Sequence, residues 1–330
     1  MEYRRMGNTG LLVSAVGLGT DQFGIRVDRE TAARIIGVAL DEGVNLIDTA
    51  NAYGGGGISD LSGVGISEEY LGESVQGHRD EFVIATKGRA RMGPGPNEEG
   101  ASRYHLMQAL EGSLRRLRTD HIDLYQIHSF DPRTPIEETM RTLDDMVRQG
   151  KVRYIGASNY AAWQLCRAND VAERYGWERF VTVQPHYHLL EREIERELVP
   201  YCRAFQIGIL PYFPLAGGLL TGRYRAGQAP PADSRAAAYP VALGYLHLYA
   251  TPRNMAIIDQ LAHFAQQRGH ALTKLAIAWL LAEPLVSSVI TGVSTVQHLR
   301  SNTGASAWAL SPEEVAAVRD IVKDSDTGLE

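Results

Sequence analysis

Short, nearly continuous apolar runs alternate along the chain with longer stretches in which apolar residues recur at helical spacing. The short runs predict strands at 16–19, 44–48, 82–86, 122–126, 153–157, 181–184, 207–212 and 287–290. The longer stretches predict helices at 28–40, 67–75, 102–118, 135–149, 160–175, 191–206, 252–268 and 296–307. Strands that are apolar on both faces favour parallel pairing, so we predict an α/β fold in which residues 1–330 form a single (β/α)8 TIM barrel domain.

An open sheet is the main competitor of the closed barrel. A doubly wound dinucleotide fold carries a Gly-x-Gly-x-x-Gly turn after its first strand, and no such turn follows the run at 16–19. Ahead of the barrel, the runs 3–6 and 11–13 flank Gly7-Asn-Thr-Gly10. Gly and Asn tolerate positive φ angles, so this pattern predicts an N-terminal β-hairpin.

Two stretches interrupt the alternation and predict long loops at the C-terminal face of the barrel. Residues 53–66 are glycine-rich but lack the Gly-Lys-Ser/Thr ending of a phosphate loop, which excludes that motif. Residues 219–251 are too long for a plain connection, and such loops often act as lids or specificity elements. A disordered insertion is the alternative for the Pro- and Ala-rich part, because its helix and strand signals are poor.

Composition limits the partners and the compartment. The 330 residues carry a formal net charge of -6 with a pI near 6.0, which gives no electrostatic reason to expect nucleic acid or an anionic membrane. There is neither a basic apolar leader nor an apolar run of spanning length, so we expect a cytoplasmic protein. Cys166 and Cys202 lie in helical patterns without metal-type spacing, and we expect both to be packed free thiols.

Four polar residues lie at or just beyond the ends of predicted strands: Asp48, Tyr53, Lys87 and His128. Barrel enzymes carry their chemistry at this face. A phenol is a weak proton donor near its reference pKa of about 10, and a nearby ammonium lowers that pKa. We expect Lys87 to supply the ammonium, with Asp48 keeping it charged, and His128 to bond a carbonyl oxygen or relay a proton. Each residue alone has a structural explanation, but their joint placement favours a catalytic site.

A series of motifs resembles the aldo-keto reductases, on the branch that includes the β subunits of potassium channels. The motifs are Asp48-Thr-Ala-Asn-Ala-Tyr53-Gly54, Thr86-Lys87, Asp123-Leu-Tyr-Gln-Ile-His128, Gly150-Lys-Val-Arg-Tyr-Ile-Gly-Ala-Ser-Asn159, and Gly292-Val-Ser294 with Asn302. The resemblance covers nearly the whole chain. It implies a nicotinamide-dependent oxidoreductase that interconverts an aldehyde or ketone and its alcohol by hydride transfer. It also implies Tyr53 as general acid/base, tuned by Lys87 and Asp48, with His128 orienting the carbonyl.

The same resemblance implies where the cofactor binds. Ser158, Asn159 and Gln184 match the residues that hold the carboxamide, and Tyr212 matches the aromatic residue stacked on the nicotinamide. The segment that follows matches the one around the pyrophosphate, with contacts expected at Pro214, Leu215, Gly217, Leu219, Thr221 and Arg223. A helix N-terminus favours anions, and contacts near the adenosine phosphate are expected at Gly292, Ser294, His298 and Asn302.

The chain departs from the family pattern near the adenosine phosphate. Many relatives have Gln or Arg at the position of His298 and Glu at that of Ser301. Residues 293–295 contain no Lys or Arg, so Ser294 with Arg300 nearby is the expected grip on a 2′-phosphate. The resemblance to the family favours NADPH as the cofactor, and NADH is the alternative.

The sequence is compatible with three alternatives to a reductase. His186-x-His188 has the spacing of a metal pair but lacks a carboxylate-rich shell, so we expect no metal. Lys87 has the place of a Schiff-base lysine in a barrel aldolase, although Asp48 nearby favours a charged amine. The third is a redox-sensing subunit with little turnover. Two observations argue against it: no long extension precedes Tyr3, and no partner patch is evident.

The expected partner is a small carbonyl compound or alcohol, whose identity the sequence leaves open along with the oligomeric state. Phe23 and Phe130 follow predicted strands and suit a hydrophobic substrate, whereas Arg89 and Arg91 suit an anionic one. Residues 239–249 are expected to reach the same mouth. Loop packing is the alternative explanation for each of them.

Overall fold

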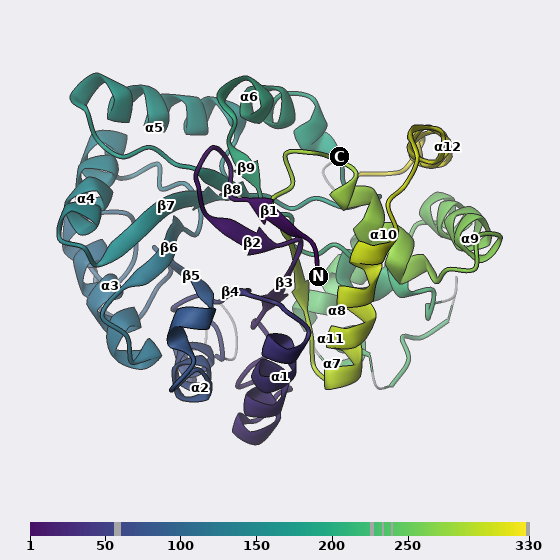
Figure 1. The fold of residues 1–330 in the computed structure, drawn as a ribbon, viewed down its shortest axis with the longest axis horizontal. Coiled ribbons are helices and arrows are strands. Elements are labelled where there is room, and N and C mark those ends of the chain that lie inside the picture. Colours follow the sequence, from purple (N-terminus) through teal and green to yellow (C-terminus); the bar gives the residue numbers. More distant parts are fainter. Residues whose placement is uncertain (56–60, 225–227, 233, 239, 328–330) are drawn as a thin grey trace.

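An eight-stranded parallel sheet forms the centre of the computed structural model, which describes residues 1–55, 61–224, 228–232, 234–238 and 240–327. Its strands, in spatial order, are β10 (Val289–Gly292), β3 (Val16–Gly19), β4 (Leu46–Asp48), β5 (Val83–Gly88), β6 (Ile122–Ile127), β7 (Val152–Ser158), β8 (Thr182–Gln184) and β9 (Gly208–Ile209). The backbone of Ile209 bonds Leu285 and Ser287, ahead of β10, and this closes the sheet. The predicted (β/α)8 barrel is confirmed (Figure 1).

Helices follow the strands and form the outer layer of the barrel (Figure 1). They are α1 (Arg29–Asp41), α2 (Ile66–Ser74), α3 (Arg103–Leu117), α4 (Ile136–Arg148), α5 (Ala162–Tyr175), α6 (Leu198–Phe205), α9 (Pro252–Gln266), α10 (Leu272–Leu281), α11 (Val296–Thr303) and α12 (Pro312–Val322). Local chemistry begins several of them, because a side-chain oxygen accepts a bond from a free amide of the first turn. Asp28 caps α1 in this way and Ser102 caps α3.

Side chains of the strands alternate between the barrel interior and the helix layer, as the two-residue period requires. Leu46, Val83, Ala85 and Leu124 belong to a small interior cluster, whereas Ile84, between two of them, packs with the helices. Residues 48, 87, 126 and 184 continue the inward-facing series toward the carboxyl ends of their strands. Each of these four positions carries a polar residue, which places polar groups at one end of the barrel interior.

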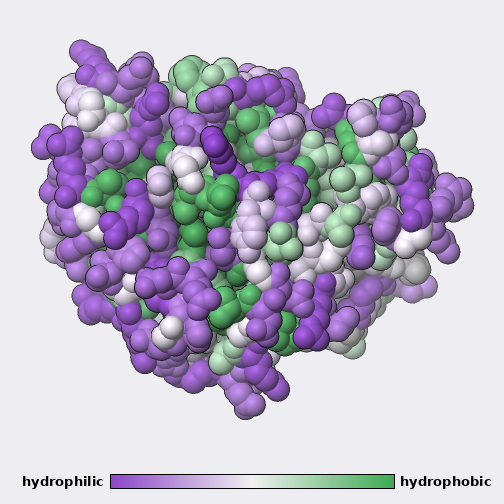
Figure 2. All heavy atoms as spheres, viewed as in Figure 1, coloured by the Kyte–Doolittle hydropathy of each residue, from purple (hydrophilic) through white to green (hydrophobic). Residues whose placement is uncertain are grey.

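A two-stranded hairpin covers the opposite end of the barrel. β1 (Tyr3–Arg5) pairs antiparallel with β2 (Leu12–Ser14), which confirms the predicted hairpin. Met6 is fully buried in the interior cluster, and the amide of Gly7 donates to Ser287 Oγ at 3.2 Å. This face is mostly hydrophilic, with hydrophobic residues visible toward its middle (Figure 2). The hairpin therefore seals the amino-terminal end and leaves the carboxyl-terminal end for the site.

Two predicted elements are shorter than expected because of proline. The helix predicted at 191–206 consists of a 3-10 turn, η2 (Glu193–Glu195), and the separate α6, which holds Pro200 in its first turn. Proline has no amide hydrogen and clashes with the preceding turn, so it is tolerated in the first turn of α6 but not in the interior of one helix across 191–206. The strand predicted at 207–212 pairs regularly only at Gly208–Ile209, since Pro211 cannot donate to the ladder.

The long connection at 219–251 contains helices that its composition did not predict. They are α7 (Arg235–Ala238) and α8 (Pro240–Tyr249), while 225–227, 233 and 239 lie outside the described residues, as do 56–60 in the glycine-rich stretch. Cys202 is buried in α6, but Cys166 is exposed on α5, so the expectation that both thiols are packed was wrong for Cys166. Among the described residues, we find no helix with the length and apolar content needed to cross a membrane.

Candidate active site

The ammonium of Lys87 is the centre of a polar cluster at the carboxyl end of the barrel. Its Nζ donates to Asp48 Oδ1 at 2.5 Å, to the carbonyl of Thr49 at 2.9 Å and to the hydroxyl of Tyr53 at 3.2 Å. Lys87 has no exposed surface. These three bonds use all three donors of the ammonium group and fix its position. The structure thus brings together the predicted trio of Asp48, Tyr53 and Lys87.

Two glutamines hold the other oxygen of the carboxylate. Asp48 Oδ2 accepts from Gln126 Nε2 at 3.1 Å and from Gln184 Nε2 at 2.8 Å. Gln126 was not predicted as a site residue. The sequence held a sign of its position, because the two-residue period of the strand places Gln126 on the same face as Leu124. In the structure Gln126 is paired with Lys87 across β5 and β6. The carboxylate is therefore fixed from three strands at once.

Lys87 is held in its charged form. Burial lowers the pKa of Lys87, but the charge of Asp48 and the bonds to Asp48 and Tyr53 outweigh it, so the net pKa is raised. A Schiff-base lysine needs the opposite, a neutral amine. The electrostatics therefore count against the aldolase alternative.

The phenol of Tyr53 differs from expectation in its acidity. Burial raises the pKa of Tyr53, and the opposing effect of Lys87 does not cancel it. The expected lowering by the ammonium is present, but the net shift is upward because burial penalises the phenolate more. Tyr53 is therefore a neutral hydroxyl at neutral pH. Since it accepts from Lys87, its own proton is available to another acceptor.

His128 lies beside the phenol and stays neutral. Its ring meets that of Tyr53 edge-on, with the centroids 5.8 Å apart. Burial, together with the charges of Lys87 and Arg89, lowers the pKa of His128 to about 3. A neutral imidazole carries one N–H donor. This arrangement suits the predicted role of bonding a carbonyl oxygen.

The residues predicted to hold the carboxamide lie side by side at the ends of β7, β8 and β9. Ser158 Oγ donates to the carbonyl of Gln184 at 2.9 Å, and Asn159 Nδ2 donates to that of His128 at 2.9 Å. Tyr212 donates its hydroxyl hydrogen to Asn159 Oδ1 at 2.8 Å. Asn159 adopts a positive φ of 54°, a conformation more common for Asn than for most residues. These contacts join the predicted platform to the catalytic cluster.

The segment predicted to follow the pyrophosphate is a tight turn. Beginning after Pro214 and Leu215, η3 (Ala216–Thr221) includes Gly217 and Gly218 at φ angles of 64° and 108°. Only glycine adopts the second angle easily, and the missing Cβ lets a ligand approach the backbone. Leu219 is buried beneath this turn, while Thr221 Oγ1 donates to the carbonyl of Gly218. The turn fits a phosphate-bearing ligand.

The residues predicted near the adenosine phosphate surround the start of α11. Thr295 caps this helix, and Ser294 Oγ lies 3.2 Å from His298 Nδ1. Asn302 is buried one turn further along, and Gly292 ends β10. A helix N-terminus with its free amides is a suitable place for an anion.

Two arginines, neither of them predicted to lie beside this helix, are close to it. Burial, followed by the charges of Arg26 and Arg223, lowers the pKa of His298. Arg223 was predicted as a contact of the pyrophosphate, whereas Arg26 was not predicted as a site residue because it lies far away in the sequence. Arg300, the arginine expected beside Ser294, instead pairs with Glu42 at 3.3 Å.

The two phenylalanines predicted at the substrate mouth have different positions. Phe23 has no exposed surface and packs in the main core, because the turn after β3 folds it inward. This position does not fit a substrate contact, so that expectation is corrected. Phe130 is partly exposed and packs edge-on against the rings of Tyr160 and Trp163, at 5.4 Å and 5.7 Å.

The pair His186 and His188 lies close together without a third metal-type ligand. Their ring centroids are 4.7 Å apart. Within the described part of the chain, no three His, Cys, Asp or Glu side chains are grouped so that they could hold a metal ion.

Comparison with known proteins gives the family. The model of the aldo/keto reductase family matches residues 15–323. The chain belongs to this family. An uncharacterized oxidoreductase of Bacillus subtilis, YrpG, is 38% identical over 97% of this chain and 96% of its own length. The versiconal hemiacetal acetate reductase of Aspergillus parasiticus is 33% identical over 96% of this chain and 95% of its own length.

Relatives with a different description are almost as similar. A probable voltage-gated potassium channel subunit beta of rice (Oryza sativa subsp. japonica) is 34% identical over 98% of this chain and 97% of its own length. The predicted resemblance to this branch is therefore confirmed. Membership in the aldo/keto reductase family makes the chain a family oxidoreductase in the coarse sense, while substrate and mechanism require separate argument.

Proposed function

We propose that this aldo/keto reductase interconverts an aldehyde or ketone and the corresponding alcohol, with NADPH as the preferred cofactor and NADH as the alternative. The observation that carries the proposal is the contact of Lys87 Nζ with both Asp48 and Tyr53 in one buried cluster. When bound, the nicotinamide supplies or accepts the hydride. The protein supplies the proton and the polar environment for the oxygen.

Tyr53 acts as the general acid in reduction. Its neutral phenol donates a proton to the carbonyl oxygen as negative charge develops there, and Lys87 stabilises the phenolate that remains. His128 donates a hydrogen bond to the same oxygen and so orients it. In oxidation the phenolate takes the proton back. Asp48 keeps Lys87 charged throughout, because the ion pair disfavours loss of the ammonium proton.

The cofactor position rests on the family match and on the fit of the residues. Asn159, Ser158 and Gln184 present amide and hydroxyl groups within one hydrogen-bonded platform, and Tyr212 offers an aromatic face. Arg26 and Arg223 give the region around α11 positive charge, which supports binding of a phosphorylated adenosine. The same charge favours NADPH over NADH.

The direct test removes one hydroxyl. Tyr53→Phe is expected to lower kcat for an aromatic aldehyde by about 10²- to 10⁴-fold, the usual contribution of a general acid. Cofactor affinity, measured by fluorescence titration with NADPH, should stay within about twofold, since the change removes no predicted cofactor contact. Tyr104→Phe, on the exposed side of α3, is the matched control. Equal turnover in Tyr53→Phe and the unaltered protein would remove Tyr53 from the mechanism.

A redox-sensing subunit is the second candidate, favoured by the similarity to probable potassium channel β subunits. Both functions need the same cofactor site but differ in turnover. Repeated oxidation of NADPH with an aromatic aldehyde supports the enzyme. Tight NADPH binding followed by a single turnover supports the sensor.

The aldolase alternative has its own experiment. Borohydride added with a carbonyl substrate traps a Schiff base as a stable adduct, detectable by mass spectrometry. Because Lys87 is charged and fully hydrogen-bonded, we expect no adduct on it. An adduct on Lys87 would overturn the proposed reductase function in favour of the aldolase function.

A further inference from the structure

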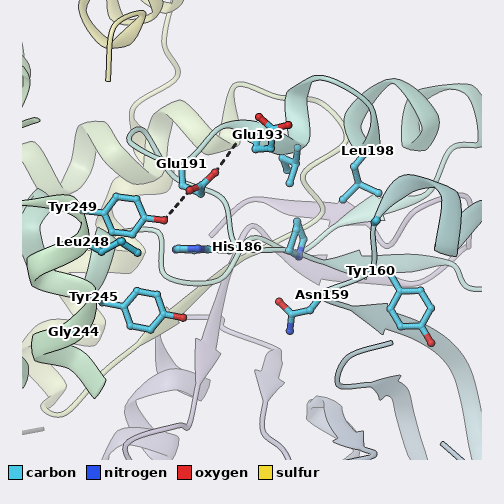
Figure 3. A pocket seen from close by; sticks show the side chains of 13 residues that line it. Asn159, Tyr160, His186, Glu191, Glu193, Leu198, Gly244, Tyr245, Leu248 and Tyr249 are labelled. Carbon is cyan, nitrogen blue, oxygen red and sulfur yellow. Dashed lines mark hydrogen bonds between the residues drawn. The ribbon is translucent and has the colours of Figure 1, made fainter. Parts of the chain in front are cut away.

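A cavity of about 540 Å³ lies at the rim of the barrel, outside the catalytic cluster. It opens between α8, the start of α6 and the ends of β7 and β8 (Figure 3). Tyr53, Lys87 and His128 are not among the residues that line it, whereas Asn159, at the edge of the predicted cofactor platform, is. We call it the Glu191 cavity, after the buried carboxylate in its wall. Nothing in the proposed reaction uses Glu191.

Glu191 is a buried carboxyl group without a cationic partner among the described residues. The side chain is only 3% exposed. Its Oε2 accepts the hydroxyl of Tyr249 at 2.7 Å and its Oε1 the amide of Glu193 at 3.3 Å, and both donors are neutral. None of the ion pairs between described residues includes Glu191. Buried carboxylates are normally paired with a cation, so a cationic ligand would supply the partner that Glu191 lacks in the wall of this cavity.

Aromatic groups surround the carboxylate and add a buried ring nitrogen without a hydrogen-bond partner. The ring of His186 meets those of Tyr245 and Tyr249 edge-on, at 5.8 Å and 5.9 Å. His186 Nε2 is buried and has no hydrogen-bond partner among the described residues. Burial lowers the pKa of His186 to about 4, so the ring brings no positive charge at neutral pH. Electron-rich aromatic faces attract cations.

Much of the remaining wall is apolar, although Asn159 and Glu193 also line it. Pro185, Ile194, Leu198 and Leu248 line it, and Figure 3 shows Leu198 across the cavity from His186. These side chains suit an apolar ligand body. A ligand that satisfies every wall has a positively charged donor at one end and a hydrocarbon or aromatic group at the other.

We propose that the Glu191 cavity binds a small organic ammonium compound with an aromatic or aliphatic body. The ammonium group donates to the Glu191 carboxylate and to His186 Nε2, and its body packs against Leu198 and the tyrosines. An anionic ligand would be repelled by Glu191. A neutral alcohol could bond His186 but would leave the buried carboxylate without a cation.

The proposal does not depend on hydride transfer, so its test uses binding alone. Isothermal titration calorimetry of the intact protein with benzylamine, benzyl alcohol and benzoate compares three ligands of similar size and different charge. We expect benzylamine to bind most tightly and benzoate not to bind. Glu191→Gln keeps the volume and an acceptor for Tyr249, and should weaken benzylamine binding at least about tenfold. Benzyl alcohol should change less than about twofold.

A matched variant and a second wall variant control the experiment. Glu193→Gln changes a carboxylate that is exposed at the rim and paired with Arg196, and should leave benzylamine binding nearly unchanged. Tyr245→Leu removes an aromatic face and should weaken benzylamine binding. It serves as the test if Glu191→Gln proves unstable. Unchanged benzylamine affinity in Glu191→Gln, equal binding of benzoate, or no benzylamine binding overturns the proposal. A result in any of these directions is independent of what Tyr53→Phe does to turnover.

Discussion

Thr86 and Lys87 are neighbours on β5, yet they belong to two different buried ion-pair clusters. Lys87 faces the barrel interior and pairs with Asp48, whereas Thr86 faces the helices and donates to Glu68 at 2.6 Å. Glu68 also accepts from Arg116 Nε at 2.7 Å. The two clusters have similar chemistry, and both carboxylates are buried, although the Arg116 side chain is 20% exposed and that of Lys87 is not exposed. In the inner cluster the hydroxyl of Tyr53 accepts from Lys87 and keeps its own proton for another acceptor, whereas in the outer cluster the hydroxyl of Thr86 donates its proton to Glu68.

The comparison teaches that a buried ion pair is not itself a sign of catalysis. The Glu68 pair connects α2, α3 and β5 within the wall of the barrel, through the bonds of Glu68 to Thr86 and Arg116. The Asp48 pair lies at the open end, where the phenol and the neutral His128 share its space. Mutations on the two sides should therefore separate activity from stability.

The largest expected effect on catalysis in this comparison is that of Lys87→Met. Removing the ammonium leaves the phenolate of Tyr53 without its cation, and kcat should fall at least about 100-fold. Single-turnover kinetics with NADPH and an aromatic aldehyde measure the loss at the chemical step. Circular dichroism checks that the variant is folded. A rate close to that of the unaltered protein would contradict the role of the inner pair.

The matching change in the outer pair, Arg116→Met, should affect stability instead. Glu68 would remain buried without its cation, and the free energy of unfolding should fall by about 3 kcal/mol. Denaturant unfolding measures this loss. Because Arg116 bonds Glu68 in the outer cluster and not the inner cluster, kcat of the folded variant should stay within about twofold. A large fall in kcat at constant stability would show that the outer cluster reaches the chemistry.

A smaller effect on catalysis is expected from Gln126→Leu. This change removes one of the two side-chain donors to Asp48 Oδ2. The loss of a hydrogen bond to a charged group is worth about 1.5 kcal/mol, and we expect roughly a tenfold fall in kcat with unchanged KM for the cofactor. Thr182→Val is the control, since Thr182 Oγ1 is a buried barrel atom without a hydrogen-bond partner. Equal kinetics of both variants would leave Gln126 a purely structural residue.

The pH dependence should show the smallest change. His128 is neutral above about pH 3, because burial and nearby cations lower its pKa. The raised pKa of Tyr53 keeps the phenol protonated through neutral pH. The rate of reduction, measured as kcat/KM, should therefore vary less than about twofold between pH 5 and 8, and fall only at high pH as Tyr53 ionises. A titration near pH 6.5 would show that His128 gains a proton in the working range.

The position of the catalytic trio was predictable because strand ends are visible in a sequence. Asp48 and Lys87 end apolar runs, and parallel strands present their carboxyl ends at the same face. The net acidity of Tyr53 was not predictable, since it depends on how much water the fold removes around the hydroxyl. The burial of Phe23 also depended on the path of a loop that no periodic pattern describes.

Helices in apolar or irregular context were the least predictable elements. Most residues of α10 are buried, so it has no polar stripe to mark its helical period. Helix α8 lies in a stretch whose Pro and Ala content favoured an irregular loop, yet it supplies Tyr245 and Tyr249 to the Glu191 cavity. Local propensity was outweighed there by packing against the barrel rim.

The sequence by itself determined the alternation of strands and helices, the N-terminal hairpin, and the placement of Asp48 and Lys87 at strand ends. These features follow from neighbours along the chain and from the two-residue period of a strand. Tertiary structure alone decided which polar groups meet: Gln126 with Asp48, Arg26 with His298, and Glu191 with Tyr249. Such contacts join residues that are distant in the chain, and their energies depend on distances and burial that exist only once the barrel closes.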